Sequence, residues 1–275
     1  MMPASIIHNV LKMINVRPIK TAAAYVGGKH KLANRIVNMI NEINHKCYAE
    51  PFCGMGNVFF SRSKKPKAEV INDRSGDIAN FFRILQRHYL QLIEILQYQI
   101  TSRREFDRLN SCDPTTLTDL ERAARFIYLQ KTCYGGKVVG RHFGVEYNRG
   151  SRFNLLKLEP IFKQIHSRLA GVVLENLDWL DFINRYDRAG TLFYCDPPYW
   201  GTEKYYGSNL FGRDQFALMA KRLKNIKGHF IMSINDVPEI WKLFEEFKIT
   251  KVGATYSIGD NKAHKASELI ITNAH

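Results

Sequence analysis

Short apolar runs alternate along the chain with longer segments in which apolar residues recur every three or four positions. The run 191–195, Thr-Leu-Phe-Tyr-Cys, is bounded by Gly190 and by two prolines, as expected of a buried strand that ends in a loop. Further strands are predicted just before Glu50 and at 70–73, 172–174, 229–234, 252–256 and 268–272. Strands that alternate with helices in this way predict an α/β fold around one sheet.

Several of the intervening segments have the apolar spacing of helices. One such face follows Lys29 and another follows Asp73. The first comprises Leu32, Ile36, Met39, Ile40 and Ile43, and the second comprises Ile78, Phe81, Phe82, Leu85, Leu92 and Ile93. Helices are also predicted over 120–129 and 214–223. Because no linker, repeat or low-complexity tract interrupts the pattern, we expect one domain with an insertion.

Size and charge narrow the class of protein. The 275 residues are 45% hydrophobic, which suffices to bury a sizeable core but leaves room for little beyond one domain and an insertion. A formal net charge of +14 and a pI near 9.6 favour a polyanionic partner over a surface that is merely solvated. The same charge would make copies of the chain repel one another, so we expect a monomer in solution, with a transient dimer on DNA left open.

The five cysteines indicate neither a disulfide framework nor a zinc site. They are odd in number and lack Cys-x-x-Cys pairs accompanied by histidines. Reduced thiols fit a cytoplasmic protein, one that joins the nucleoid when it binds DNA. The N-terminus has no signal-peptide core, and no apolar stretch is long enough to span a bilayer. We therefore expect no metal and no membrane partner.

A carboxylate, two prolines and an aromatic ring follow the run 191–195 directly, as Asp196-Pro197-Pro198-Tyr199. The prolines fix two φ angles and stiffen a turn at the sheet edge where α/β folds bind ligands. Methyl transfer to the exocyclic amine of a base needs such a set, because acceptors on both N–H groups favour the pyramidal geometry that frees the lone pair. Asp196 and the Pro197 carbonyl would be those acceptors, and Tyr199 would stack on a flipped base. The alternative is an ordinary Asp-Pro turn whose tyrosine packs on the core.

A glycine loop after the strand at Glu50 indicates a cofactor site. Gly54 and Gly56 would let the backbone approach a ligand closely, although any tight turn between a strand and a helix has the same need. Asp73 comes 19 positions after Gly54, close to the spacing at which an acidic side chain binds ribose hydroxyls. A plain helix N-cap is the competing interpretation of Asp73.

A second glycine segment lies upstream, where Gly27-Gly28 precedes Lys29 at the start of a predicted helix. Lys29 would pair with a carboxylate, and Tyr25 would lie against an apolar or cationic part of the cofactor. A solvated lysine is the alternative, so this assignment depends on the other motifs.

The segment 101–170 carries thirteen Lys or Arg against seven Asp or Glu, a charge that suits DNA phosphates. Within it, residues 135–153 are rich in glycine and include Lys137, Arg141, Asn148, Arg149 and Arg152. Arginine and asparagine side chains read base edges in a major groove, although basic loops more often contact phosphate. We therefore expect this segment to bind double-stranded DNA, with base and phosphate contacts both open.

Together these motifs resemble the DNA adenine methyltransferase family related to Dam, from about Tyr25 to Asn273. The family's motifs occur in a fixed order, which ends in Asp-Pro-Pro-Tyr after a DNA-reading insertion. Here Glu50-Pro51-Phe52-Cys53-Gly54-Met55-Gly56, Asn72-Asp73 and Asp196-Pro197-Pro198-Tyr199 stand in that order, and residues 267–273 look like its closing strand. Tyr25-Val26 departs from the Trp-Ala of close relatives but keeps an aromatic residue.

The resemblance implies a Rossmann-like class I methyltransferase sheet made by residues 1–78 and 171–275. The insertion at 79–170 would be a mostly helical DNA-recognition domain with a hairpin at 135–153. S-adenosylmethionine would donate the methyl group, directly and without a metal, to adenine in double-stranded DNA, with Asp196, Pro197 and Tyr199 as catalytic residues. The implied cofactor pocket comprises Tyr25, Lys29, Phe52, Gly54, Gly56, Asp73, Leu177 and Asp196. A longer piece at 137–146 than in related proteins leaves the recognition sequence open, GATC included.

Three other functions are compatible with the sequence. A DNA-binding protein of the same fold without turnover is the first, but the intact Asp196 and Tyr199 favour an enzyme. Methylation of the cytosine exocyclic amine is the second, although related enzymes of that type usually carry Ser in place of Asp196. The third is an RNA or protein amine methyltransferase, which the DNA-reading insertion disfavours. The chain contains no Pro-Cys pair of the kind used to attack the cytosine ring.

Overall fold

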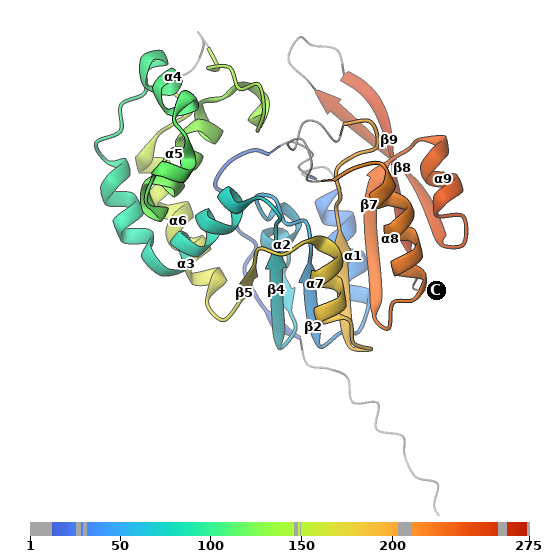
Figure 1. Cartoon of the computed structure of the whole chain (residues 1–275). Coiled ribbons are helices and arrows are strands. Elements are labelled where there is room, and N and C mark those ends of the chain that lie inside the picture. The colour runs from blue at the N-terminus through green and yellow to red at the C-terminus, as the bar shows by residue number, and fades with distance from the viewer. Residues whose placement is uncertain are drawn as a thin grey trace, which may run out of the picture.

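A seven-stranded sheet lies at the centre of the structure (Figure 1). This computed structural model describes residues 13–25, 29, 32–145, 148, 150–202, 211–257 and 263–273. In spatial order the strands are β5 (Val173–Glu175), β4 (Ala68–Asn72), β2 (Cys47–Glu50), β6 (Thr191–Cys195), β7 (His229–Asn235), β9 (Ala263–Thr272) and β8 (Lys248–Ser257). The strands from β5 to β7 are parallel, whereas β9 is antiparallel to both β7 and β8. The expected Rossmann-like α/β sheet is therefore confirmed.

The strand order reverses beside β2. After β2, the chain adds β4 and β5 on one side and then β6 and β7 on the other. At such a reversal the connections on the two sides diverge, which makes the carboxyl ends of the two central strands the usual ligand position of α/β sheets. The loops that follow Glu50 and Cys195 start from this position.

Side chains alternate between the two faces of the sheet and enter two separate cores. In β6, Leu192 and Tyr194 belong to one core, and Phe193 and Cys195 belong to the other. The helices α1 (Ala33–Glu42) and α2 (Asn57–Ser61) contribute to the first core, and α7 (Trp179–Tyr186), α8 (Asp214–Lys224) and α9 (Pro238–Leu243) contribute to the second. Because both faces are covered, the parallel strands are apolar on both sides, which explains their unbroken hydrophobic runs.

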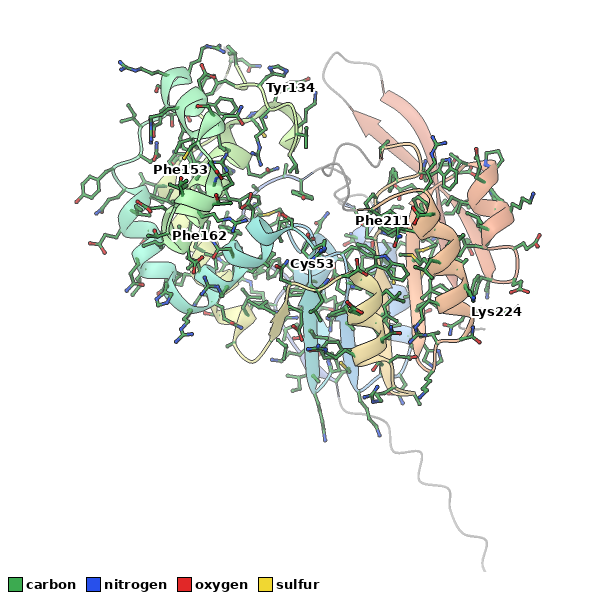
Figure 2. All side chains as sticks on the ribbon, viewed as in Figure 1. Cys53, Tyr134, Phe153, Phe162, Phe211 and Lys224 are labelled. Atoms are coloured by element: carbon green, nitrogen blue, oxygen red, sulfur yellow. The ribbon has the colours of Figure 1, made fainter. Side chains whose placement is uncertain are left out.

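Four helices between β4 and β5 form a group beside the sheet, here called the helical group (Figure 1). They are α3 (Gly76–Leu96), α4 (Arg103–Ser111), α5 (Asp119–Thr132) and α6 (Leu155–Leu169). The ring of Phe81 on α3 lies 5.5 Å from that of Phe126 on α5 and 6.1 Å from that of Phe162 on α6. Phe162 is labelled in Figure 2, within the helical group. These aromatic contacts join three of the helices in the same core that covers the first face of the sheet.

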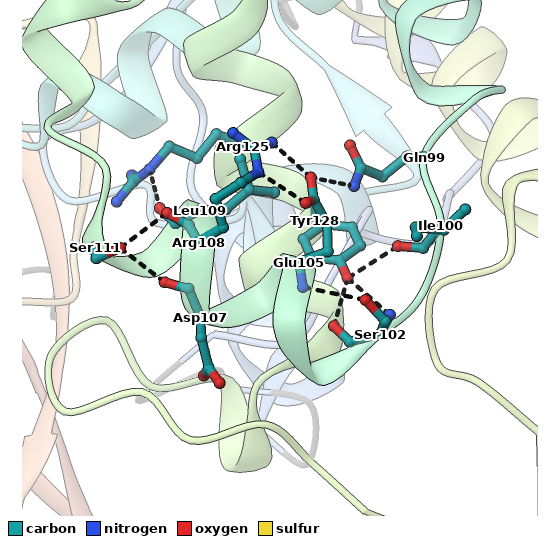
Figure 3. A network of polar contacts seen from close by, with 10 residues as sticks. All are labelled: Gln99, Ile100, Ser102, Glu105, Asp107, Arg108, Leu109, Ser111, Arg125 and Tyr128. Atoms are coloured by element: carbon teal, nitrogen blue, oxygen red, sulfur yellow. Dashed lines mark hydrogen bonds and ion pairs between the residues drawn. The ribbon is translucent and has the colours of Figure 1, made fainter.

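Polar contacts attach α4 to α5 (Figure 3). The Tyr128 hydroxyl donates to the Ile100 carbonyl at 3.1 Å, and the Arg125 Nε donates to the Leu109 carbonyl at 2.7 Å. A capping box formed by Thr118 and Glu121 starts α5. The helical group is thus ordered by hydrogen bonds as well as by apolar packing.

The structure describes most of the segment 135–153, where a hairpin was expected, and that hairpin stays a prediction. A single antiparallel bridge, between Cys133 and Phe143, closes this loop instead of a ladder of paired strands. Gly135, Gly136 and Gly140 adopt φ values of 69°, 67° and 63°. This left-handed conformation interrupts an extended strand, so the glycines produce turns inside the loop.

The remaining elements are short. The strands β1 (Ile14–Asn15) and β3 (Lys64–Lys65) pair with each other, and η1 (Pro114–Thr116) and η2 (Tyr134–Gly136) are single 3₁₀ turns. None of the helices in the described part of the chain combines the length and the apolar character needed to cross a membrane.

A buried ionic network joins the helical group to the sheet. Glu69 on β4 accepts two hydrogen bonds from the Arg168 guanidinium, both at 2.7 Å, and lies 2.9 Å from the Nη1 atom of Arg62. The Arg62 guanidinium also lies 3.8 Å from the ring centroid of Tyr48. One carboxylate therefore compensates two buried cations, so its removal leaves both uncompensated.

We expect Glu69→Gln to lower the free energy of unfolding by about 3–5 kcal/mol, because it leaves buried charge without a counterion. Urea denaturation measures this loss. The matched control is Glu246→Gln, which removes an ion pair with Lys224 that is more than half exposed, and should cost less than about 1 kcal/mol. Equal losses in the two variants would contradict the role given to the network.

Candidate active site

Three loops meet at the carboxyl edge of the sheet, after β2, β4 and β6. The backbone N–H of Gly54 donates to the Asp73 carboxylate at 2.8 Å, and the N–H of Cys53 donates to the Asn72 carbonyl at 2.9 Å. Because parallel strands end at the same edge, residues far apart in sequence are brought together here.

Asp196 directly follows β6 and is held by two side chains. Its Oδ1 atom lies 2.8 Å from the Lys29 ammonium and accepts a 3.1 Å hydrogen bond from the Ser233 hydroxyl. Ser233 in turn pairs with the Tyr194 hydroxyl at 2.7 Å. The Asp196 side chain keeps 20% of its surface exposed, so it is oriented from below yet still reachable.

Burial raises the pKa of Asp196 to about 6, against the opposing effect of the Lys29 charge. Its carboxylate is therefore the main form at neutral pH. Burial also raises the pKa of Glu50 to about 8, with the charges of Asp196 and Asp73 adding to the rise. Glu50 is fully buried and accepts a hydrogen bond from the Tyr48 hydroxyl. Three carboxyl groups thus converge under the site, and the deepest is mostly protonated at neutral pH.

Lys29 is only 2% exposed and contacts the chain's own acidic groups. Besides Asp196, its ammonium lies 3.5 Å from the Glu268 carboxylate and donates to the Tyr199 hydroxyl at 2.6 Å. The alternative interpretation, in which Lys29 is a solvated lysine, is therefore wrong. Its expected partner, a carboxylate, is supplied within the chain; a contact with a cofactor stays a prediction.

The turn 196–200 is fixed at both ends. Pro197 and Pro198 are buried, and the Trp200 backbone exchanges two hydrogen bonds with the Asn235 side chain at the end of β7. Tyr199 is partly buried, and burial raises the pKa of its hydroxyl. The tyrosine is held through that hydroxyl by Lys29, so the position of its ring is determined.

The glycine loop requires residues without a side chain at two positions. Gly54 has a φ of 50°, and a Cβ atom there would lie 3.2 Å from the Tyr25 ring. Gly56 has a φ of 73°, and a Cβ atom there would lie 2.6 Å from the Phe60 ring. The structure therefore brings Tyr25 against the glycine loop, and its contact with a cofactor stays a prediction. Phe52 packs edge-on against Phe211, with ring centroids 5.8 Å apart.

Asp73 braces the turn between β4 and α3. Its two carboxylate oxygens accept from the N–H groups of Gly54 and Ser75, at 2.8 and 2.9 Å. Burial raises its pKa to about 6, against the effect of these two hydrogen bonds. The N-cap position of α3 is occupied by Ser75, so the N-cap interpretation of Asp73 is wrong. The ribose role of Asp73 stays a prediction.

Sequence reasoning missed the function of Asn72, which is buried beside Asp73. Its Nδ2 group donates to the carbonyls of Pro51 and Leu177, at 2.9 and 3.1 Å, and its Oδ1 atom accepts from the Leu177 N–H at 2.7 Å. Asn72 thereby joins Leu177 to the loop after β2, and the cofactor contact of Leu177 stays a prediction. An asparagine at the end of a buried strand was the available signal, because such an amide needs several partners. Ser233, Asn235 and Glu268 were missed as well.

The residues predicted to bind DNA lie between α5 and α6. Lys137 and Asn148 are exposed, whereas Arg141 is half-buried and donates from Nε to the Lys137 carbonyl at 3.2 Å. Burial lowers the pKa of Arg141. Arg152, with Thr101 and Phe143 among its neighbours, lines a cavity of about 190 Å³. Arg149, like Gly27 and Gly28, lies outside the described residues.

Metal-binding side chains do not gather anywhere in the described ranges: groups of three or more His, Cys, Asp or Glu with suitable geometry are absent there. The five cysteines are all free thiols. The polar groups at the carboxyl edge are instead carboxylates, a buried lysine and backbone N–H groups. Such a set suits hydrogen bonding to an organic cofactor and to the amino group of a base.

Comparisons with known proteins agree with this chemistry. Residues 25–258 match the family model described as D12 class N6 adenine-specific DNA methyltransferase. The chain is similar to the Type II methyltransferase M1.LlaDCHI of Lactococcus lactis subsp. cremoris, with 29% identity over 94% of this chain and 96% of that protein. It is also similar to the Type II methyltransferase M.MjaIII of Methanocaldococcus jannaschii, with 29% identity over 93% and 99%. The DNA adenine methylase of Haemophilus influenzae is 25% identical over 90% and 91%.

We expect Lys29→Met to raise the pKa of Asp196 above about 6, because the nearest cation no longer stabilises the carboxylate. Carbon-13 NMR titration of the side-chain carboxyl groups, with Asp196→Asn for assignment, measures the shift. A raised pKa in the folded state means that this group's contribution to stability is complete below about pH 4 and is lost as pH rises through about 6. The loss should grow in Lys29→Met and extend to higher pH.

Lys251→Met is the control, because Lys251 pairs with Asp236 rather than with Asp196. It should leave the titration of Asp196 in place. An unchanged or lowered Asp196 pKa in Lys29→Met would show that the ion pair does not control this carboxylate.

Proposed function

The chain belongs to the D12 class of N6 adenine-specific DNA methyltransferases, and from this premise we propose how its residues perform the reaction. Asp196 and the carbonyl oxygen of Pro197 accept the two N–H bonds of an adenine amino group. The single observation that carries the proposal is the Asp196 carboxylate, oriented by Lys29 and Ser233 at the end of β6 and still exposed at the edge of the sheet.

Acceptors at these two positions act on the nitrogen lone pair. In free adenine this lone pair is delocalised into the ring, so the amine is a weak nucleophile. Hydrogen bonds to Asp196 and Pro197 favour the pyramidal nitrogen, and they strengthen as positive charge develops on it. The nitrogen then forms a bond to the methyl carbon as the carbon–sulfur bond breaks, and it loses one proton. Asp196, with a pKa of about 6, is a suitable base for that proton.

S-adenosylmethionine supplies an electrophilic methyl group when it is bound. The residues proposed to hold it are Tyr25, Lys29, Phe52, Gly54, Gly56, Asp73 and Leu177. Several of them support one another: Tyr25 lies against Gly54, Gly54 is bonded to Asp73, and Leu177 is placed by Asn72. An acidic side chain, an aromatic ring and close backbone approach fit an adenosine with a charged sulfonium.

The amino group of adenine in a duplex is stacked between neighbouring bases. We infer that the base is flipped out and that the ring of Tyr199 stacks on it. Lys29 fixes the hydroxyl end of that ring, so the partly buried tyrosine offers a flat surface in a defined place. Extrusion costs a few kcal/mol of stacking, which contacts with the bound duplex must offset.

Double-stranded DNA is proposed to lie against the loop that joins α5 and α6. Lys137, Asn148 and Arg152 are the described candidates for contacts there, with Arg141 close behind them. Residues 1–78 and 171–275 would then form the catalytic domain and residues 79–170 the recognition domain. The net charge of +14 supports a monomer that approaches DNA by electrostatic attraction.

We expect Asp196→Ala to reduce methyl transfer at least about 10²-fold, because it removes an acceptor that acts mainly in the transition state. The measurement is incorporation of labelled methyl from S-adenosylmethionine into DNA, followed by nucleoside digestion to identify N6-methyladenine. DNA affinity should change little, and Asp181→Ala, an exposed position on α7, should retain the parent rate. Label found only in cytosine, RNA or protein would refute the substrate, and a parent that binds DNA without transfer would refute the activity.

We expect Lys137→Ala to flatten the dependence of log Kd on log salt by about one unit, equally for all duplex sequences, if this exposed lysine contacts phosphate. Fluorescence anisotropy with labelled duplexes at several salt concentrations measures the slope. The control is Lys224→Ala, which removes the same charge from α8, away from the helical group (Figure 2). Equal slopes for the two variants would place the DNA elsewhere.

A further inference from the structure

One buried side chain joins the segment that carries Tyr25 to the loop that carries Lys137 and Arg141. Gln130, near the end of α5, is only 2% exposed. Its Nε2 group donates to the Ala24 carbonyl at 2.8 Å and to the Gly136 carbonyl at 2.7 Å. The two acceptors belong to segments that are 112 positions apart in the sequence, and a single amide group holds both.

The two segments also touch each other directly. Gly136 has a φ of 67°, and a Cβ atom there would lie 3.0 Å from the carbonyl oxygen of Ala24. The Oε1 atom of Gln130 is buried and has no hydrogen-bond partner. An unsatisfied buried oxygen costs free energy, so a glutamine at this position needs an explanation. Its two N–H bonds to separate segments supply one.

Further contacts extend from Ala24 and from Gly136, the two acceptors of Gln130. On one side, Ala24 precedes Tyr25, whose ring lies against Gly54, and Gly54 is bonded to Asp73. On the other side, Gly136 precedes Lys137, whose carbonyl accepts from the Arg141 Nε. A movement of the loop after α5 would therefore displace the Gly136 carbonyl. Through Gln130, that displacement would shift the Ala24 carbonyl, next to Tyr25.

We propose that Gln130 is a positioning residue that couples cofactor binding to DNA binding. The inference rests on the proposed function, since it assigns Tyr25 to the cofactor and the loop 133–143 to DNA. Coupling of this kind is reciprocal: DNA raises the affinity for the cofactor by the same factor as the cofactor raises the affinity for DNA. Gln130 contacts neither ligand and acts through Ala24 and Gly136.

The test measures the dissociation constant of S-adenosylhomocysteine by calorimetry, with and without saturating sheared duplex DNA. For the parent protein we expect DNA to tighten binding at least about 5-fold, within the usual range of coupling between sites. In Gln130→Leu, which keeps the size of the side chain but has no N–H donor, this factor should fall to near one. Gly136→Ala places a methyl group about 3.0 Å from the Ala24 carbonyl oxygen, and it should lower the coupling factor as well.

Gln86→Leu is the matched control. The Gln86 Nε2 group also donates to two backbone carbonyls, those of Leu169 and Val172, both at 2.9 Å, but neither carbonyl belongs to the proposed ligand loops. This variant should lose stability comparably and keep the parent coupling factor. If Gln130→Leu fails to fold, Gly136→Ala decides between the outcomes.

Three results would overturn the inference. A parent protein that binds S-adenosylhomocysteine or DNA not at all would overturn the proposed function and this inference with it. A parent that binds both, while Gln130→Leu and Gly136→Ala keep its coupling factor, would overturn the inference alone. Loss of coupling in Gln86→Leu to the same extent would also overturn it, because the effect would then follow from general loosening.

Discussion

The side chain of Asn72 holds the carboxyl ends of three parallel strands in one arrangement. By bonding to the backbone after β2 and after β5, it fixes both loops relative to β4. Asp73 follows it immediately and binds the glycine loop. The amide is fully buried, so its hydrogen bonds do not compete with water and each lost partner would leave a desolvated group. The glycine loop, Asp73 and Leu177 depend on that arrangement for their relative positions.

A second constraint is electrostatic. The site gathers four acidic side chains, Glu50, Asp73, Asp196 and Glu268, and the buried Lys29 ammonium pairs with two of them, Asp196 and Glu268. Carboxyl groups therefore outnumber the cation at this edge of the sheet. Burial raises the pKa of the first three carboxyls, and the excess is reduced because Glu50 is mostly protonated at neutral pH. The carboxylates that stay ionised favour positive charge nearby, both on a sulfonium and on an amine nitrogen that gains a fourth bond.

Much of this arrangement could be predicted from the sequence, because parallel strands place the residues after β2, β4 and β6 at one edge. The strands of the large sheet and the helices α1, α3, α5 and α8 follow from hydrophobic pattern, and the pairing of Gly54 with Asp73 agrees with their spacing. The helices α4, α6, α7 and α9 were not predicted individually. The groups that hold Asp196, Trp200 and Lys29 could not be predicted. They are Ser233, Asn235 and Glu268, which reach the site through the pairing of β7 with β6 and β9, and pairing register is not visible in one sequence. The path of the loop 135–153 could not be predicted either, because glycines permit a hairpin turn and an irregular loop equally well.

The helical group occupies the place of a single crossover. Residues 73–172 connect β4 to β5, two neighbouring parallel strands, a link for which a dozen or so residues suffice. The connection leaves the sheet at Asp73 and returns at Val173, and within it Arg168 and Gln130 contact Glu69 and Ala24. The loops between its helices can lengthen without disturbing these contacts. A connection of this kind can accept or exchange an inserted recognition domain during evolution. The residues at the carboxyl edge of the sheet need not change when it does.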